Sequence, residues 1–546
     1  MAQEYKLKGI SALDLKDGEK REVEVHGVEE GKVLLVKQGG KTHAMSSNCT
    51  HYGAPLKLGV LTPDGRLTCA WHGACFKVDT GDVEDAPALD PLAKFEIAEK
   101  DGAVYIKGEE STIKSNRRSP NYKCSAQGQE KVVIVGGGSG TVGALHALRE
   151  QGFKGPITVI SKEPNLPLDR TKLSKALMVD ASKLEWRPKE WYDEASIEMV
   201  SDEVSGVDFG SKKLSTASGK EYPYTKLILA TGGTPKALPL PGFKELQNIF
   251  LLRFITDAQA IMSAAGEEKG KKIVVIGSSF IGMEVANCLS QKGHTVTVVG
   301  METAPMERIM GAEVGSIFQK LLEKNGVKFR MGANVEKATP SPSQSSHVGA
   351  VHLKDGTTLA ADLVILGVGV RPATDFLKGK VDLLDDGSLR TNESFQVAGL
   401  TDVYAIGDIA TYPYHGPGGN GTPTRIEHWN VAQNAGRSVA ACIAHPGAKP
   451  KSFIPVFWSA LGLQLRYCGN APGGWDEVMV KGSKDEAKFA AFYTKGETVV
   501  AVACMQMDPV MTKCAELMRR GGMPGKRELE GGVDVLELGL PGAVKI

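Results

Sequence analysis

The stretch VVIVGGGSG at residues 132–140 decides the fold that we expect for most of this chain. Its four β-branched residues predict a buried strand, the glycines after them predict a tight loop, and residues 144–151 read as a helix. In such a unit, backbone N–H groups and the positive end of the helix can meet a pyrophosphate, whose approach a larger side chain would block. The stretch therefore predicts a dinucleotide site in a doubly wound α/β domain, with a structural glycine turn as the alternative.

A second copy of this pattern, IVVIGSSFIG, follows at residues 273–282. Each copy is succeeded by another apolar strand, at residues 157–160 and 295–299. Both loops depart from the ideal GxGxxG spacing, because Thr141 takes the third glycine position of the first loop and Ser279 the middle one of the second. Two such copies, each after its own strand, predict two dinucleotide sites in one chain.

Cysteine and histidine are paired twice near the start of the chain, as CTH at residues 49–51 and CAWH at residues 69–72. Two thiolates and two imidazoles suit a Rieske [2Fe-2S] cluster, in which the cysteines hold one iron and the histidines the other. The predicted ligands are Cys49, Cys69, His51 and His72. The same donor set also suits zinc, but the 17 residues between His51 and Cys69 are not a zinc-finger spacing.

The composition excludes several classes of protein. The 546 residues include 65 basic and 64 acidic side chains, so the chain has no net attraction for nucleic acid or for an anionic membrane. No apolar run approaches the 18 or so residues that cross a bilayer. The first residues resemble neither a signal peptide nor an organelle presequence, which predicts a cytoplasmic protein and leaves a mitochondrial association open. The nine cysteines form no disulfide framework.

The changes in sequence pattern predict a multidomain chain. We expect an all-β Rieske domain, two α/β Rossmann-like domains and an α+β carboxy-terminal domain. A Ser-, Pro- and charge-rich linker follows the first domain and, as a flexible coil, would have a reach of about 25 Å that could let this domain move. The expected boundaries are 1–110 for the Rieske domain, 111–130 for the linker, 131–255 and 391–450 for the two parts of the first nucleotide domain, 256–390 for the second nucleotide domain, and 451–546 for the last domain.

Four stretches carry a resemblance to a known family. They are CAWHGACF at 69–76, LDRTKLSK at 168–175, IGSSFIGME at 276–284 and AFYTKG at 491–496. On these, the chain resembles the Rieske-bearing branch of the apoptosis-inducing-factor-like (type 3) flavoproteins, which are related to the FAD-dependent ferredoxin reductases of dioxygenase systems. The resemblance implies an NAD(P)H-dependent oxidoreductase with FAD and a [2Fe-2S] cluster as cofactors.

The resemblance also implies which residues hold FAD. The first glycine loop would contact the pyrophosphate, an acid would bind the adenosine ribose, an arginine would face the phosphates, and a second turn and a late acid would complete the site. The pyrophosphate contacts would be Gly136, Gly138 and Ser139, the ribose acid would be Glu163, and the arginine would be Arg170. The second turn would be Thr231 and Gly232, and the late acid Asp408.

Three residues are implied to act at the flavin ring. Lys175 would place a cation beside it and stabilise its anionic reduced form, and Glu284 would fix the direction of that lysine. Trp429 matches an aromatic residue near the flavin and the nicotinamide. Outside this context, the lysine and the glutamate could be ordinary surface charges and the tryptophan an ordinary core residue.

The second loop is expected to bind the nicotinamide cofactor. The backbone contacts would come from Gly277, Ser279 and Gly282, with Gly367 and Gly369 on a facing strand. An acid after the next strand binds a ribose 2′-OH, whereas an arginine there accommodates a 2′-phosphate. Because Glu302 lies in that region and no arginine stands between the strand at 295–299 and Arg308, we favour NADH, with NADPH as the alternative.

Together these features predict that electrons pass from NADH through FAD to the cluster and on to an external acceptor, either a protein or a small molecule. No Cys-x4-Cys pair precedes Lys175, so the redox disulfide of glutathione-reductase-type enzymes is missing. We expect His51 and His72 to be partly exposed and to form the exit. The alternatives are the reductase component of an oxygenase or nitrite reductase system, and a redox-sensing cell-death factor. A homodimer is left open.

Overall fold

The stretch that opens the first nucleotide domain forms the middle strand of a parallel sheet in the computed structural model, which describes residues 2–546. All four residues of β11 (Val132–Val135) are buried, as expected for a strand that is covered on both faces. The sheet order is β13-β12-β11-β17-β29. The other strands and the main helices of this domain are β12 (Ile157–Ser161), β13 (Ile197–Ser201), β17 (Lys226–Leu229), β29 (Val403–Ala405), α2 (Ser139–Glu150), α3 (Thr171–Lys175), α4 (Lys189–Glu194) and α8 (Trp429–Ala444).

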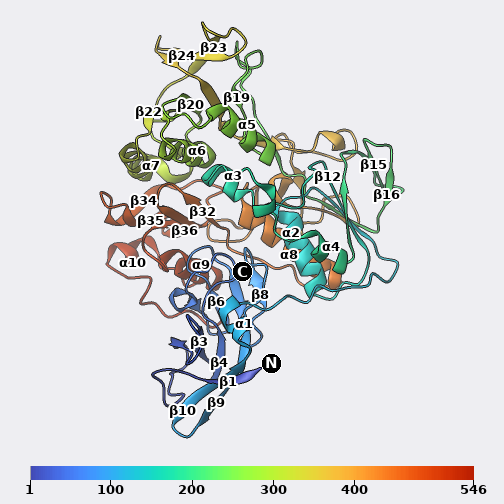
Figure 1. The fold of residues 1–546 in the computed structure, drawn as a ribbon, viewed down its shortest axis with the longest axis vertical. Helices are drawn as coiled ribbons and strands as arrows, with labels where there is room; N and C mark the ends of the chain where they lie inside the picture. The colour runs from blue at the N-terminus through green and yellow to red at the C-terminus, as the bar shows by residue number, and fades with distance from the viewer. Residues whose placement is uncertain (1) are drawn as a thin grey trace.

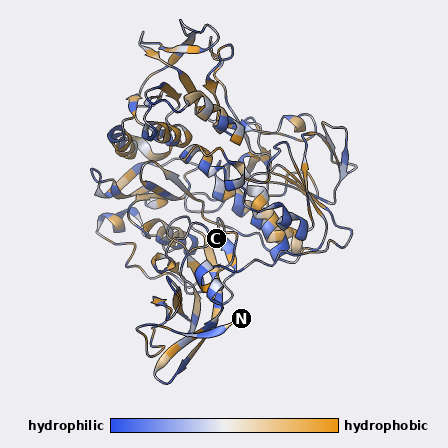
Figure 2. Ribbon diagram, in the orientation of Figure 1, coloured by the Kyte–Doolittle hydropathy of each residue, from blue (hydrophilic) through white to orange (hydrophobic). Residues whose placement is uncertain are grey.

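The second nucleotide domain repeats this arrangement and lies at the top of Figure 1, in green and yellow. Its parallel sheet has the order β19-β26-β20-β21-β22, so the strand before the second glycine loop is again central. The elements are β19 (Ile249–Phe250), β20 (Lys272–Ile276), β21 (Thr295–Val299), β22 (Lys328–Arg330), β26 (Leu363–Leu366), α5 (Ile255–Ala265), α6 (Phe280–Gln291) and α7 (Glu307–Lys324). Figure 2 shows how the hydrophobic residues gather on the sheet strands, whereas the helices carry both colours.

The first domain is built from two antiparallel sheets, as predicted for an all-β unit. One has the order β1-β10-β9-β4-β3-β2 and the other β5-β6-β7-β8. The strands are β1 (Gln3–Lys6), β2 (Lys20–Glu24), β3 (Lys32–Gln38), β4 (Lys41–Ser46), β5 (Val60–Leu61), β6 (Arg66–Thr68), β7 (Cys75–Lys77), β8 (Val83–Asp85), β9 (Lys94–Lys100) and β10 (Ala103–Gly108). The CTH segment follows β4, and the CAWH segment connects β6 to β7.

The last domain is a five-stranded antiparallel sheet with helices, so it has the expected α+β composition. The sheet order is β32-β33-β36-β35-β34. The elements are β32 (Val456–Ala460), β33 (Gln464–Gly469), β34 (Glu477–Ser483), β35 (Lys488–Lys495), β36 (Thr498–Met505), α9 (Val510–Arg520) and α10 (Lys526–Glu530). In Figure 1 this domain lies between the second nucleotide domain and the first domain, so it is placed to contact both.

The segment that we expected to be a flexible coil differs from that expectation. It begins inside a short helix, α1 (Glu110–Ser115), whose Ile113 is buried against the first domain. Further along, the backbone N–H of Cys124 donates to the carbonyl oxygen of Glu194 at 2.9 Å, beside α4. A composition poor in apolar residues hid these contacts, because one buried side chain and a backbone hydrogen bond are enough to hold such a segment against its neighbours.

Candidate functional site

A cavity of 720 Å³ lies where the carboxyl ends of the first parallel sheet meet the second glycine loop. Both loops contribute to it, the first through Gly136 and Ser139 and the second through Ser279. The loops after β17 and β29 complete the wall with Thr231 and Asp408. Ligands of doubly wound sheets bind in a crevice at this edge of the strands, so the cavity lies where a dinucleotide is expected.

Two positions in the glycine loops require glycine, because the backbone of a neighbouring segment lies very close to them. Gly136 has φ +111°, and a Cβ atom there would lie 2.2 Å from the carbonyl oxygen of Ala230. Gly277 has φ +110°, and its Cβ would lie 2.3 Å from the carbonyl oxygen of Gly367. By contrast, nothing lies within 4 Å of a Cβ placed on Gly138, just before α2. The first loop therefore packs tightly against the sheet while leaving open space at the helix amino terminus, as a phosphate requires.

A buried ion pair lies on the cavity wall between α3 and α6. The ammonium of Lys175 is 3.0 Å from a carboxylate oxygen of Glu284, which is 3% exposed. The hydroxyls of Ser174 and Ser459 each donate to one oxygen of the same carboxylate. The predicted contact of Lys175 with Glu284 is therefore present. Ser459, from β32, is a partner that the sequence analysis missed, because no local pattern connects it to α6.

The predicted ribose and phosphate residues are linked in a chain of charges. Glu163 forms an ion pair with Arg170, whose guanidinium donates to the carbonyl oxygen of Arg253 at 3.0 Å. The side chain of Arg253 lies 3.1 Å from a carboxylate oxygen of Asp408. Burial lowers the pKa of the Arg170 guanidinium, although Glu163 acts in the opposite direction. Arg253 also lines the cavity, and the sequence analysis did not identify it.

The indole of Trp429 provides an independent sign that the cavity suits a cofactor. Its Nε1 is buried without a hydrogen-bond partner, and the residue lines the cavity. A buried donor without a partner is costly and is normally satisfied by a ligand or by water. Together with the open space before α2, this donor fits a bound dinucleotide.

The predicted nicotinamide residues lie around the second loop. Ser279 and Gly369 line the cavity, and a Cβ on Gly282 would lie 2.1 Å from the carbonyl oxygen of Gly277. Glu302 lies just beyond β21, with a carboxylate oxygen 3.4 Å from the hydroxyl of Ser278. Its other oxygen is 2.7 Å from Arg308, whose side chain is 73% exposed. Glu302 therefore lies beside the second glycine loop and is paired with Arg308.

The four predicted cluster ligands come together in pairs of the same type. The thiols of Cys49 and Cys69 contact each other, and the Nδ1 atoms of His51 and His72 are 3.1 Å apart. In residues 2–546, no three His, Cys, Asp or Glu side chains converge as a single-metal site. The donor set, two thiols beside two imidazoles, is the one that a two-iron Rieske cluster uses.

Matching loops hold these ligands. The N–H of Cys49 donates to the carbonyl oxygen of Ala54, and that of Cys69 donates to Ala74, both at 2.8 Å. Burial lowers the pKa of His51 to about 3 and that of His72 well below its usual value. Burial therefore favours the neutral form of both imidazoles, which is the form that binds metal.

The expectation that both histidines are partly exposed was wrong for His72. It is 6% exposed and packs against Trp458, with ring centroids 4.4 Å apart. Trp458 belongs to β32 and lines the dinucleotide cavity. The sequence analysis missed this contact because a strand about 390 positions away supplies the covering ring. His72 therefore faces the interior, and we no longer assign it to the exit.

The first domain is docked firmly against the rest of the chain, which differs from the loose tether that we expected. Its contacts reach both the first nucleotide domain and the last domain. They include Arg187 to Asp90 (2.5 Å), Asn430 to the Ala86 carbonyl (3.0 Å), Arg437 to the Val83 carbonyl (2.7 Å), Arg466 to the Trp71 carbonyl (3.0 Å) and Thr512 to the Cys69 carbonyl (3.2 Å).

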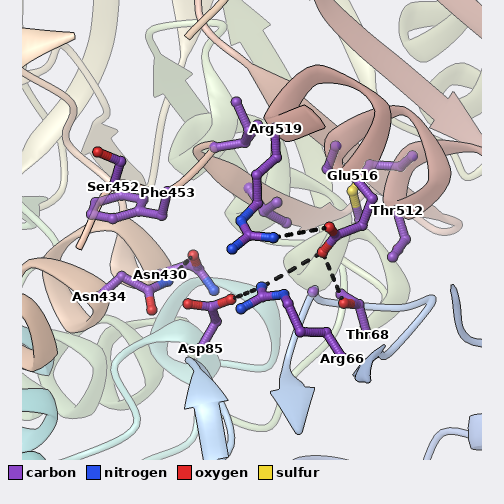
Figure 3. Close-up of a pocket in the computed structure, with 15 residues that line it drawn as sticks. Arg66, Thr68, Asp85, Asn430, Asn434, Ser452, Phe453, Thr512, Glu516 and Arg519 are labelled. Carbon is purple, nitrogen blue, oxygen red and sulfur yellow. Dashed lines mark hydrogen bonds and ion pairs between the residues drawn. The ribbon is translucent and has the colours of Figure 1, made fainter. Parts of the chain in front are cut away.

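A buried charge cluster reinforces this docking, around a small cavity of 40 Å³ shown in Figure 3. Glu516 of α9 is 3% exposed and accepts a hydrogen bond from the hydroxyl of Thr68 at 3.1 Å. Arg66 and Arg519 lie 3.6 Å from its carboxylate, and Arg66 also pairs with Asp85. The cluster joins β6 and β8 to α9, so it ties the first domain to the last.

Comparison with known proteins agrees with this architecture. The chain belongs to the pyridine nucleotide-disulphide oxidoreductase family, whose model matches residues 130–436. A Rieske [2Fe-2S] domain matches residues 6–96, and a reductase C-terminal domain matches residues 456–533. The chain is an oxidoreductase that transfers electrons and uses FAD, NAD(P)H and a [2Fe-2S] cluster.

Among individual proteins, the chain is similar to apoptosis-inducing factor 3 of Homo sapiens. The two are 39% identical over 526 residues, which cover 95% of this chain and 84% of the human one. Monodehydroascorbate reductase 3 of Arabidopsis thaliana is 32% identical over 404 residues, or 68% of this chain and 88% of that protein.

Solved structures of ferredoxin reductases are also similar. The covalent putidaredoxin reductase-putidaredoxin complex has a chain that matches with a TM-score of 0.70 and 28% identity, over 75% of this chain and 98% of that one. The ferredoxin reductase for the CYP199A2 system of Rhodopseudomonas palustris matches with a TM-score of 0.64 and 29% identity, over 69% and 91%. No helix within residues 2–546 is long and apolar enough to cross a membrane.

Proposed function

We propose that this chain oxidises NADH with bound FAD and passes the electrons singly through its own Rieske cluster to an external acceptor. The proposal depends on one observed contact. Trp458 lines the dinucleotide cavity and packs against the predicted cluster ligand His72, with ring centroids 4.4 Å apart. When bound, FAD supplies the chemistry that converts two-electron hydride transfer into one-electron transfer. The family membership and the ferredoxin-reductase neighbours support the same direction of transfer.

The cavity residues have separate roles in this proposal. Gly136, Gly138 and Ser139 present backbone groups and the α2 amino terminus to the FAD pyrophosphate. Lys175 places positive charge at the flavin, and Glu284 keeps that ammonium in place. The remaining residues that we assign to FAD are Glu163, Arg170, Thr231, Gly232, Asp408 and Trp429, all of which line the cavity.

The second loop provides the nicotinamide site in this proposal. Gly277, Ser279, Gly282 and Gly369 supply its backbone, and Glu302 accepts from the ribose 2′-OH of NADH. A 2′-phosphate would meet this carboxylate and be repelled, and Arg308, the nearby guanidinium, is already paired with Glu302. Glu302→Gln removes a charge-assisted hydrogen bond, which is worth about 1.5–3 kcal/mol. We therefore expect the preference for NADH over NADPH in kcat/KM to fall about tenfold or more. Glu313→Gln, at an exposed ion pair, is the matched control.

The proposed route is tested with the holoenzyme under anaerobic conditions. Substoichiometric NADH is mixed in a stopped-flow instrument while flavin and cluster absorbance are recorded, and parallel samples are frozen for EPR. We expect the flavin to bleach first and a rhombic cluster signal to follow. If the flavin bleaches and the cluster stays oxidised, the cluster is not on the route and the proposal is wrong.

A second candidate function is a role in cell death, which the name of the relative at 39% identity suggests for that relative. Lys175→Ala separates the two functions, because it slows flavin reduction without removing the folded chain. A cellular phenotype that persists in this variant would assign the signalling role to the folded protein and not to its redox activity.

Oligomeric state and compartment stay predictions. The homodimer that was left open is tested by sedimentation of the holoenzyme. The cytoplasmic placement, with a mitochondrial association as the alternative, is tested by fractionation of cells that produce the tagged full chain. The acceptor can be a protein or a small molecule, and neither nucleic acid nor membrane insertion enters the proposal.

A further inference from the structure

The two predicted histidine ligands have different surroundings. His72 is buried, and its shortest ring contact is with Trp458 in the cavity wall, at 4.4 Å. His51 is stacked on Tyr52, with centroids 3.8 Å apart and planes inclined by 18°. Tyr52 is 39% exposed. Each ring also lies near the other imidazole, but at a longer centroid distance: Trp458 to His51 is 5.7 Å and Tyr52 to His72 is 5.6 Å. The closest ring to His72 therefore borders the dinucleotide cavity, whereas the closest ring to His51 reaches the surface.

We propose that these two sides divide the path of the electron, so that it arrives by way of Trp458 and His72 and leaves by way of His51 and Tyr52. The inference rests on the function proposed above and adds the place where the acceptor binds, which is the exposed face of Tyr52. In each turnover NADH becomes NAD⁺ and a proton, and its two electrons reduce two one-electron acceptors.

Contacts from the first nucleotide domain fix the tyrosine ring over His51. The Tyr52 hydroxyl donates to the carboxylate of Asp169, and the ammonium of Lys172 lies 5.5 Å from the ring centroid. Both partners belong to the segment around the start of α3. The outward ring is therefore held in position only while the first domain is docked.

A competing inward path runs from Trp429 through Trp186 to His51. Its ring centroids are separated by 5.4 Å between the tryptophans and by 6.4 Å between Trp186 and His51. This path crosses one more ring and has wider gaps than the single step from Trp458 to His72, which is also shorter than the 5.7 Å from Trp458 to His51. We therefore assign the inward path to Trp458, and Trp186 provides the matched control.

The test uses the holoenzyme with Trp458→Leu, Tyr52→Leu and Trp186→Leu. One stopped-flow experiment follows reduction of the cluster after NADH is added. A second follows reoxidation of the prereduced cluster by an oxidised ferredoxin, a protein acceptor that is too large to enter the space left over His51 in Tyr52→Leu. We expect Trp458→Leu to slow reduction about tenfold or more and to leave reoxidation within about twofold, and Tyr52→Leu to do the opposite. Trp186→Leu stays within about twofold in both experiments.

A readout that does not depend on turnover accompanies the rates. Aqueous chromium(III) oxalate enhances the relaxation of a nearby reduced cluster in EPR. Tyr52→Leu uncovers His51 and is expected to increase this enhancement, whereas Trp458→Leu leaves it at the wild-type value. Unchanged EPR g-values and flavin absorption show that each variant is folded and loaded, and Tyr52→Phe, which keeps the ring, is expected to retain wild-type reoxidation.

The outcomes separate this inference from the function on which it rests. If NADH does not reduce the cluster of the wild-type protein, the proposed function fails. If the wild-type cluster is reduced but Tyr52→Leu slows neither step or both steps equally, the division of the path is wrong. A larger effect of Trp186→Leu than of Trp458→Leu on reduction overturns the inward assignment.

Discussion

Glu516→Gln tests how firmly the Rieske domain is docked. The carboxylate is buried and lies among three guanidinium groups, those of Arg66, Arg519 and Arg520. Removing one partner of a buried ion pair costs about 3–5 kcal/mol. Arg66 and Arg520 keep Asp85 and Asp64 as further partners, so we expect the low end of that range, about 3 kcal/mol.

The assay is equilibrium urea denaturation followed by the visible circular dichroism of the cluster, with flavin fluorescence as a second probe. We expect the cluster transition to move to lower urea and the flavin transition to change less, because the lost contact holds only the first and last domains together. Glu477→Gln, at an exposed ion pair with Lys526, is the control and should change stability by less than about 0.5 kcal/mol. An equally small effect of Glu516→Gln would refute the reasoning that this cluster stabilises the docking.

Three further predictions concern the flavin, the nicotinamide and acid stability. Lys175→Ala should slow flavin reduction by NADH about 10²-fold in stopped-flow experiments, since it removes the cation at the flavin, and an unchanged rate would contradict that role. Gly277→Ala places a Cβ 2.3 Å from the opposing carbonyl, so the protein should stay yellow with FAD while losing measurable NADH affinity in calorimetry. Burial tends to raise the pKa of Asp85, but Lys451 and Arg66 outweigh it and hold the pKa well below its usual range. This stabilisation is present above the unfolded pKa, near 4, and is lost as the pH falls below that value, so melting temperatures should drop there in the wild type and less in Asp85→Asn.

The sequence predicted those parts of the site that depend on local patterns. The glycine loop at Gly136 needs only a strand before it and a helix after it, and both are local. The donor set of Cys49, His51, Cys69 and His72 could likewise be predicted, because it lies in two short segments of the sequence. Lys175 and Glu284 could be paired only because the resemblance supplied a contact between two distant helices.

The environment of the cluster could not be predicted in the same way. Trp458 covers His72, and Glu516 joins Arg66, across hundreds of intervening residues. Such contacts depend on how whole domains pack, and neither hydrophobic periodicity nor motif spacing reports domain packing. The linker was wrongly predicted to be a flexible coil for a related reason, since its polar composition gives no sign that Ile113 packs into the core of the first domain.

Neighbouring residues on one strand touch both redox sites. Successive side chains of a strand point to opposite faces, and on β32 Trp458 contacts His72 while Ser459 donates to Glu284. A slip of β32 by one residue would turn both side chains away from their partners at once. The carboxy-terminal domain therefore sets the surroundings of both the cluster and the flavin. Exchanging it for that of a relative would change the packing against His72 and the hydrogen bonding of Glu284 at the same time.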